Sequence, residues 1–208
     1  MSCTMLLIRH GETMWNAEKK LQGHRDVPLS EVGVLQAQAL AQKLEAHPID
    51  AVYASDLSRA VQTAEALASS RGLKVQSVPE LREMNFGLWE GMSYQEIQAN
   101  YPGQLNAWCK DPLSAKPPDG ELVSEMAVRV FEAMKSIVTA NENRQVAVVC
   151  HGGPIRAFVA KLLGMNLQDN WRIRQDNVAL NVIDFPTWEE AIVMLLNDTN
   201  HISQMIKS

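Results

Sequence analysis

With 208 residues, of which 46% are hydrophobic and 21% charged, the chain has the composition of one folded domain over residues 1–208 rather than of a disordered segment. Its 24 acidic and 19 basic side chains leave a formal net charge of −5, which argues against a nucleic-acid-binding surface. The apolar runs are far shorter than the roughly 20 residues of a membrane-spanning helix, and the N-terminus lacks a secretory signal pattern. Three cysteines without a CxxC spacing favour a reducing compartment, so we expect a cytoplasmic protein.

The first half of the chain alternates short apolar runs with helical patterns. Apolar runs bounded by turn residues predict buried strands, and apolar residues spaced three and four apart predict a buried helix face. Ser30 is a typical helix-capping residue, and Gly72 is placed to end a helix. In chain order we expect a strand at Thr4–Ile8, a helix from Ser30 to Leu44, a strand at Ala51–Ala54, a helix from Asp56 or Ser58 to Gly72, and a strand at Lys74–Val78.

The second half continues this alternation after one proline-rich loop, Asp111–Gly120. We expect a short helix that begins at the capping box Ser93–Glu96 and ends before Pro102, a long amphipathic helix at Glu121–Ala140, a strand at Gln145–Cys150, a helix from Gly153 or Pro154 to Leu163, and a hairpin of Val178–Phe185 and Ala191–Asn197. Strands that alternate with helices predict an α/β fold of three layers, in which helices flank a mostly parallel central sheet.

Unusual polar residues follow four of the predicted strands, at the carboxyl ends where α/β sheets bind ligands. They are Arg9-His10, Ser58-Arg59, Arg82-Glu83 and His151-Gly152. Guanidinium groups match the oxygens of a phosphate, a neutral imidazole is a nucleophile for phosphorus, and a carboxylic acid can protonate a leaving oxygen. Backbone N–H groups at the helix start after His151 add an anion-binding end. This set of groups predicts phosphoryl chemistry.

At these same positions the sequence resembles the histidine phosphatase superfamily, which includes the phosphoglycerate mutases. The motifs appear in order along most of the chain: Leu7–Thr13 with Trp15-Asn16, Leu29–Gly33, Ser58–Ala60 with Thr63-Ala64, Leu81–Glu83 with Phe86-Gly87 and Trp89–Gly91, and His151–Gly153 with Arg156. The resemblance implies the phosphoglycerate mutase-like fold, a central sheet with one antiparallel strand. It also implies that residues 92–120 form a small helical lid inserted over the site.

The resemblance also implies a role for each site residue. His10 corresponds to the nucleophile that becomes phosphohistidine, and Arg9 and Arg59 to the guanidinium clamps on the phosphate. His151 corresponds to the second histidine, which hydrogen-bonds the phosphoryl oxygens. Glu83 corresponds to the proton donor for the leaving oxygen, and afterwards to the base that activates water.

Further positions are expected to line the phosphate site. Asn16 matches the family's asparagine that hydrogen-bonds the phosphoryl group, and Gln22 and Gly23 lie where the family lines its pocket. Gly152 offers a backbone N–H to the phosphate, as expected at a helix start. The roles of His24, Arg82, Trp15 and Trp108 in substrate selection stay open.

A metal site is not expected. His10 and Glu12 have the spacing of a metal pair, but no further ligand cluster accompanies them and the neighbouring arginines would repel a cation. We therefore expect neither metal nor cofactor, and a small phosphorylated metabolite as the partner, with no nucleic acid and no membrane. An oligomer is not indicated.

These site residues are compatible with three functions: a phosphatase, a mutase and a non-catalytic binding module. The segment 92–120 helps to distinguish them. A mutase must hold the substrate's carboxylate and keep water out, and the mutases resembled here carry two adjacent arginines and a lysine in a longer insertion. This segment offers only Lys110 and Lys116. We therefore expect a phosphomonoester hydrolase acting on α-ribazole phosphate, phosphoserine or mixed monoesters. A cofactor-dependent phosphoglycerate mutase is the alternative, and a non-catalytic binding module a remote one, since all five catalytic positions are filled.

Overall fold

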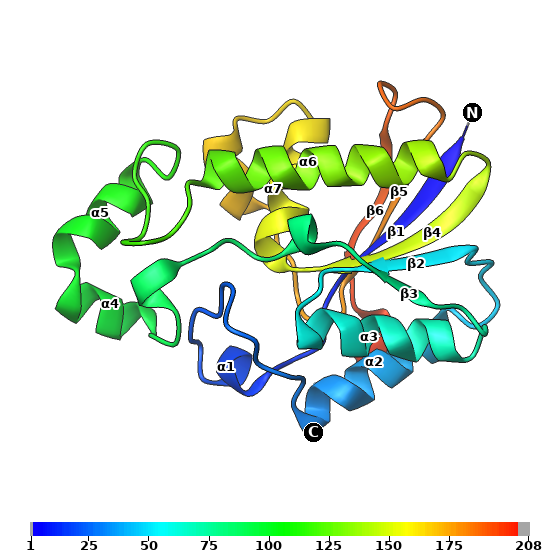
Figure 1. The fold of residues 1–208 in the computed structure, drawn as a ribbon, viewed down its shortest axis with the longest axis horizontal. Coiled ribbons are helices and arrows are strands. Elements are labelled where there is room, and N and C mark those ends of the chain that lie inside the picture. The colour runs from blue at the N-terminus through cyan, green and yellow to red at the C-terminus, as the bar shows by residue number, and fades with distance from the viewer. Residues whose placement is uncertain (1, 204–208) are drawn as a thin grey trace.

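A computed structural model describes residues 2–203, and its centre is a six-stranded mixed sheet with strand order β3-β2-β4-β1-β5-β6 (Figure 1). β1 pairs parallel with β4 and antiparallel with β5, so β5 is the one strand that runs against its neighbours. The mostly parallel sheet with one antiparallel strand is confirmed. The strands span Cys3–Arg9 (β1), Ala51–Ala54 (β2), Val75–Ser77 (β3), Arg144–Cys150 (β4), Leu180–Phe185 (β5) and Ile192–Asp198 (β6).

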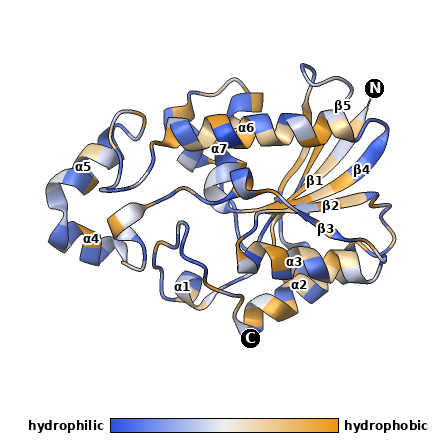
Figure 2. Cartoon of the chain, viewed as in Figure 1, coloured by the Kyte–Doolittle hydropathy of each residue, from blue (hydrophilic) through white to orange (hydrophobic). Residues whose placement is uncertain are grey.

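Helices cover both faces of the sheet, which confirms the three-layer prediction (Figure 1). One face packs against α6 (Val123–Ala140) and α7 (Gly152–Leu162), the other against α2 (Glu31–Lys43) and α3 (Ser58–Ser69). Successive residues of a strand point to opposite faces, so a central strand contributes side chains to the hydrophobic cores on both faces of the sheet. In β1, Met5 faces the α6–α7 side and Leu6 the α2–α3 side. Figure 2 shows the resulting hydrophobic colouring along the central strands.

Local sequence signals place most helix ends correctly. The hydroxyl of Ser30 accepts the N–H of Gly33, which caps α2 as predicted. The reciprocal capping box of Ser93 and Glu96 is also present. One strand begins later than predicted: β5 starts at Leu180, because Val178 has a φ of 50°, a left-handed conformation that a strand cannot contain.

Residues 92–120 extend from one end of the molecule and contain two helices, α4 (Tyr94–Asn100) and α5 (Pro102–Lys110), followed by the predicted loop (Figure 1). They share a small core of Trp89, Ile97 and Leu105. The predicted helix that ends before Pro102 is confirmed as α4, but the second helix α5 was not predicted. Proline is compatible with the first position of a new helix, where its absent N–H is not needed.

The remaining elements are short. They are α1 (Met14–Ala17) and the 3₁₀ helices η1 (Pro79–Leu81), η2 (Gly87–Trp89), η3 (Leu167–Arg172) and η4 (Asn200–Ile202), none of which was predicted. Within residues 2–203, every helix is too short or too polar to cross a membrane.

Candidate active site

Two histidines meet at the carboxyl edge of the sheet. Arg9 at the end of β1 is in register with Cys150 at the end of the adjacent parallel strand β4, so the next residues, His10 and His151, emerge side by side. Their ring centroids are 5.0 Å apart, and their side chains are almost completely buried. The predicted convergence of the strand-end residues on one edge is therefore seen for these two imidazoles.

Hydrogen bonding fixes the tautomer of His10. Its Nδ1 lies 2.7 Å from the carbonyl oxygen of Gly11, which can only accept, so Nδ1 carries the proton. The lone pair is then on Nε2. Burial, together with the nearby charges of Arg59 and Arg9, holds the pKa of His10 well below the usual 6.5. His10 is therefore a neutral imidazole with an unprotonated Nε2 at neutral pH, the form that acts as a nucleophile.

His151 is neutral in the same way, but its two nitrogens have protein partners. Nδ1 lies 3.3 Å from Nε of Arg59, and because a guanidinium only donates, Nδ1 accepts. Nε2 therefore carries the proton and donates to the hydroxyl of Ser55 at 2.9 Å. Burial and the charge of Arg59 lower the pKa of His151 well below its ordinary value. Ser55, which orients this ring, was not among the predicted site residues.

Arg59 lies at the start of α3 and is completely buried. Its Nη1 donates to the carbonyl of Arg25 at 2.9 Å and its Nη2 to the carbonyl of Gly23 at 2.8 Å. Burial lowers the pKa of Arg59 to about 10, so the guanidinium remains charged at neutral pH. The residue thus carries a fixed positive charge into the site and ties the loop at residues 23–25 to it.

Arg9 brings a second, partly buried cation to the N-terminus of α7. One Nη donates to the carbonyl of Gln175 at 2.6 Å, while Nε is buried with no hydrogen-bond partner among residues 2–203. Burial lowers the pKa of Arg9 to about 10, with the charge of Glu83 opposing this shift and the charge of Arg156 adding to it. A Cβ on Gly152 would lie 3.6 Å from Nε of Arg9 and 3.8 Å from an Nη of Arg156. Two guanidinium groups and a helix N-terminus therefore surround one point.

Asn16 lies in the short helix α1, and Gln22 and Gly23 lie on the loop that follows it. Oδ1 of Asn16 accepts from the backbone of Thr13 and from the amide of Asn177, which leaves its NH₂ group to donate elsewhere. The side-chain oxygen of Gln22 is buried and lacks a partner among the described residues. Gly23 has a φ of 53°, and a Cβ there would lie 2.0 Å from the carboxylate of Glu90. The loop is therefore closely fitted at this glycine.

Glu83 lies on an irregular segment between η1 and η2, and its carboxylate sits at the start of α7. One oxygen accepts the N–H of Met84 at 2.9 Å and the N–H of Gly153 at 3.1 Å. A Cβ on Gly153 would come within 2.2 Å of this oxygen, so only glycine leaves room for the carboxylate. The predicted acid thus accepts a hydrogen bond from Gly153, which follows His151 by two residues. Tertiary contacts, and not its place in the sequence, bring Glu83 to this helix.

A pocket of about 510 Å³ opens beside Glu83. Its walls combine apolar side chains, among them Trp108 from α5, with the charged side chains of Lys110, Arg156 and Asp169. Of the positions left open, Trp108 therefore lines the pocket. Arg82 instead forms an ion pair with Asp56 at 2.5 Å, away from the pocket. Arg156 belongs to the motif that begins at His151, and its place beside the pocket was not predicted.

The two other open positions have structural contacts. The ring of Trp15 packs over Gly91, where a Cβ would lie 3.1 Å from it. His24 makes its ring contact with the main chain of Glu83, at 2.9 Å from Nε2 to the carbonyl oxygen. Over residues 2–203, no three His, Cys, Asp or Glu side chains are grouped in a way that would bind a metal ion.

Comparison with known proteins identifies relatives over nearly the whole chain. The family model of the histidine phosphatase superfamily (branch 1) matches residues 5–199. Phosphoserine phosphatase 1 of Hydrogenobacter thermophilus is 32% identical over 200 residues, 96% of this chain and 94% of that protein. A Yersinia pestis protein named "Probable phosphoglycerate mutase GpmB" is 32% identical over 179 residues, 86% of this chain and 83% of that protein. The crystal structure of the α-ribazole phosphatase from Shigella flexneri matches with a TM-score of 0.87 and 33% identity, covering 94% of this chain and 96% of that one.

Proposed function

The chain belongs to branch 1 of the histidine phosphatase superfamily, and we propose that it is a phosphatase that hydrolyses small phosphomonoesters through a phosphohistidine at His10. The observation that carries this proposal is the protonation state of His10. Its Nδ1–H is committed to the carbonyl of Gly11, and its Nε2 is unprotonated near the cations Arg9 and Arg59. A neutral nucleophile surrounded by positive charge is suited to attack a phosphate dianion, because the cations offset the charge that otherwise repels a nucleophile.

In the first step, Nε2 of His10 attacks phosphorus and the bond from phosphorus to the ester oxygen breaks. Arg9 and Arg59 bind the phosphoryl oxygens, and the amide of Asn16 and the N–H of Gly152 add neutral donors. Glu83 gives its proton to the departing oxygen, which leaves as an alcohol. The electron pair of the broken bond stays on that oxygen, and the phosphoryl group is now on His10.

In the second step, water attacks the phosphohistidine. Glu83, now a carboxylate, takes a proton from the water as its oxygen bonds to phosphorus. The N–P bond breaks, and its electron pair returns to Nε2 of His10. Inorganic phosphate leaves and the enzyme is restored. His151 assists both steps through Arg59: its Nδ1 accepts from Nε of Arg59 and its N–H donates to Ser55, which holds the guanidinium whose charge stabilises the phosphoryl oxygens in the transition state.

The alcohol half of the substrate is expected to occupy the pocket beside Glu83, because the leaving oxygen must reach that carboxyl group. The apolar walls, with Trp108 among them, suit an organic group larger than a hydroxymethyl, and Arg156 suits an anionic or strongly polar part of it. α-Ribazole phosphate, phosphoserine or mixed monoesters are the proposed substrates. The similarity to a phosphoserine phosphatase and to an α-ribazole phosphatase supports this choice.

A second candidate function, phosphoglycerate mutase, is favoured by one observation. Lys110 and Arg156 both line the pocket, where they would hold the carboxylate of a phosphoglycerate. The rest of the segment 92–120 argues against it, since it contains one other lysine, Lys116, and no arginine. A mutase that protects its phosphoenzyme needs charged residues to close over the substrate and exclude water.

The lifetime of the phosphoenzyme tests the proposal. Rapid-quench labelling with a ³²P-monoester should give an acid-labile, base-stable phosphoprotein that decays in buffer no more slowly than steady-state turnover. A panel of phosphoserine, α-ribazole phosphate, 3-phosphoglycerate and fructose bisphosphates then ranks substrates by kcat/KM. A phosphoenzyme that lasts for minutes and passes its phosphate to 3-phosphoglycerate rather than to water would establish the mutase instead. Binding without any phosphate release would leave only the non-catalytic module.

A further inference from the structure

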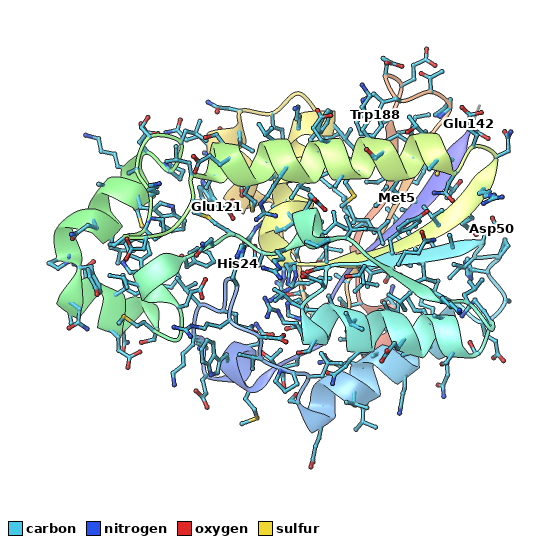
Figure 3. The ribbon with its side chains drawn as sticks, viewed as in Figure 1. Met5, His24, Asp50, Glu121, Glu142 and Trp188 are labelled. Atoms are coloured by element: carbon cyan, nitrogen blue, oxygen red, sulfur yellow. The ribbon has the colours of Figure 1, made fainter. Side chains whose placement is uncertain are left out.

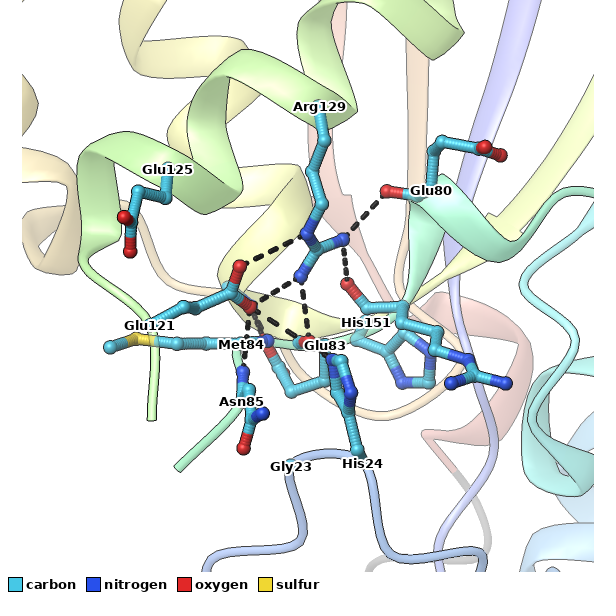
Figure 4. A network of polar contacts seen from close by, with 12 residues as sticks. Gly23, His24, Glu80, Glu83, Met84, Asn85, Glu121, Glu125, Arg129 and His151 are labelled. Atoms are coloured by element: carbon cyan, nitrogen blue, oxygen red, sulfur yellow. Dashed lines mark hydrogen bonds and ion pairs between the residues drawn. The ribbon is translucent and has the colours of Figure 1, made fainter. Parts of the chain in front are cut away.

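One arginine outside the phosphate site is hydrogen-bonded to the main chain around Glu83. Arg129 projects from α6, and its Nη1 donates to the carbonyl oxygens of Glu80 at 2.6 Å and Arg82 at 2.7 Å (Figure 4). Its Nη2 donates to the carbonyl oxygen of Glu83 itself at 2.9 Å. Three carbonyl groups within four residues of chain therefore converge on a single guanidinium group.

Glu121 completes this contact from the segment just before α6. Its carboxylate accepts from Nη2 of Arg129 at 2.6 Å and from Nε at 3.1 Å, the paired geometry that orients a guanidinium plane. One of its oxygens also accepts the N–H of Asn85 at 2.7 Å. Glu121 thus holds Arg129 in place and binds the segment 80–85 directly.

His24 contacts the same segment as well. Because the carbonyl oxygen of Glu83 can only accept, Nε2 of His24 carries a proton and donates to it. Nε2 of His24 also lies 3.9 Å from a carboxylate oxygen of Glu121, and Figures 3 and 4 show these two residues close together beside the segment. The residue before His24, Gly23, accepts a hydrogen bond from Arg59, so the loop that contacts the acid also contacts the phosphate-binding arginine.

The segment needs such contacts because it has no regular structure of its own. Between η1 and η2, residues 82–86 form neither helix nor strand. The carboxylate of Glu83 must nevertheless reach the N-terminus of α7 with the accuracy that proton transfer requires, where an error of about 1 Å can cost roughly 100-fold in rate. Main-chain carbonyls held by Arg129 and His24 provide that accuracy.

We propose that Arg129, supported by Glu121 and His24, is a positioning residue that sets the main chain of residues 80–85 so that Glu83 can transfer its proton. The inference rests on the proposed function, since it assumes that Glu83 is the proton donor. In the proposed mechanism, Arg129 touches neither the substrate nor the reacting atoms. Its loss should therefore weaken proton donation and leave phosphate binding and the attack by His10 largely unchanged.

The test uses two leaving groups and a matched arginine. In Arg129→Met we expect kcat/KM to fall about 10- to 100-fold for an alkyl monoester such as phosphoserine, and by no more than about 3-fold for p-nitrophenyl phosphate, whose leaving group needs no proton. Arg71 is the control, because it also donates to two carbonyl oxygens, those of Leu67 and Leu44, at the opposite end of α3. Arg71→Met should leave the ratio of the two substrates unchanged.

Milder variants keep the test decisive if Arg129→Met does not fold. Arg129→Lys retains the charge but cannot bridge three carbonyls, so it should shift the same ratio in the same direction. His24→Gln keeps an N–H donor and should resemble the wild type, whereas His24→Leu should resemble Arg129→Lys. Combining Arg129→Lys with Glu83→Gln should add nothing to the ratio beyond Glu83→Gln alone.

The outcomes distinguish failure of the proposed phosphatase function from failure of the positioning role of Arg129. If the wild type releases no phosphate from any monoester, the proposed function fails. If the wild type is active and Glu83→Gln is selective for poor leaving groups, but the Arg129 variants lose both substrates equally, only the positioning role is overturned. Equal losses with a lowered Tm would mean that Arg129 serves stability alone.

Discussion

The site has two sides that are built differently. On the phosphate side, His10 and His151 are placed by the ends of neighbouring paired strands, and Arg59 by the first turn of a helix. On the leaving-group side, Glu83 lies on irregular chain and is held at α7 by contacts from α6, from Glu121 before it and from the loop at residues 23–24. The geometry of the phosphate side depends mainly on backbone hydrogen bonds between strands, whereas the geometry of the leaving-group side depends on hydrogen bonds from individual side chains.

This difference predicts how each side responds to change. A sheet edge is held by many backbone hydrogen bonds, so a substitution of His10 removes a chemical group without moving the strand ends. The leaving-group side has few restraints, so residues that never touch substrate can alter it. Variants of the two sides should therefore be distinguishable by their dependence on the leaving group, and the following expectations are ordered by size.

The largest effect should come from the nucleophile. His10→Ala should lower kcat/KM by at least about 10³-fold for phosphoserine and for p-nitrophenyl phosphate alike, as loss of a covalent catalyst typically does. Cys150 cannot replace it, because burial raises the pKa of its thiol far above neutral. The check is steady-state phosphate release with both substrates. Retention of more than about a tenth of the wild-type rate would remove His10 from its assigned role.

Glu83→Gln should give a large but selective loss. We expect roughly a 100-fold fall for an alkyl monoester and less than about 10-fold for p-nitrophenyl phosphate, since the two alcohols differ in their need for a proton. The measurement is the mutant-to-wild-type ratio of kcat/KM for each substrate. Equal ratios would mean that Glu83 is not the general acid, and the contrast between the two sides would disappear.

Gly153→Ala should copy this selectivity at smaller amplitude. The new methyl group would lie 2.2 Å from the carboxylate of Glu83 and must displace it, so we expect about a 10-fold loss on alkyl monoesters. Alanine is favoured over glycine in a helix by up to about 1 kcal/mol, so Tm should not fall much. Gly103→Ala in α5, where a Cβ meets nothing within 4 Å, is the matched control and should leave both ratios unchanged.

Acid should lower the free energy of unfolding of the protein through the two histidines of the phosphate side. The pKa values of His10 and His151 lie well below 6.5 in the folded protein, so as pH falls through 6.5 only the unfolded chain takes up these protons. Stability is therefore present above pH 6.5 and declines below it, by on the order of 1 kcal/mol per histidine at one pH unit lower. Urea unfolding at pH 7.5 and 5.5 measures the decline, which should be smaller in His10→Asn. An equal decline in both proteins would show that His10 protonates normally when folded.

The smallest effect is expected from metal removal. In the proposed mechanism the guanidinium groups of Arg9 and Arg59 supply positive charge and hydrogen-bond donors to the phosphoryl group, so EDTA should leave the rate unchanged. Vanadate, which adopts a trigonal-bipyramidal geometry, should inhibit competitively. Inactivation by EDTA followed by rescue with added metal would contradict this expectation.

Much of the fold could be predicted because its signals are local. The apolar run of β1 and the capping hydroxyls of Ser30 and Ser93 each act within a few residues of chain. Where prediction was wrong, the cause was a tertiary or conformational effect that the local pattern does not contain. Val178 has the residue type of a strand but a left-handed conformation, and α5 begins at a proline that the same reasoning treats as an end.

The sequence by itself predicted which groups would carry the chemistry and, through the strand-end rule, that His10 and His151 lie together. Only the tertiary structure decided what surrounds them. The tautomer of His10 depends on the conformation of Gly11, and the place of Glu83 depends on Arg129, 46 residues further along the chain. Sequence patterns report contacts between neighbours in a strand or helix, whereas hydrogen bonds to main-chain carbonyls depend on chain geometry and leave no pattern of their own.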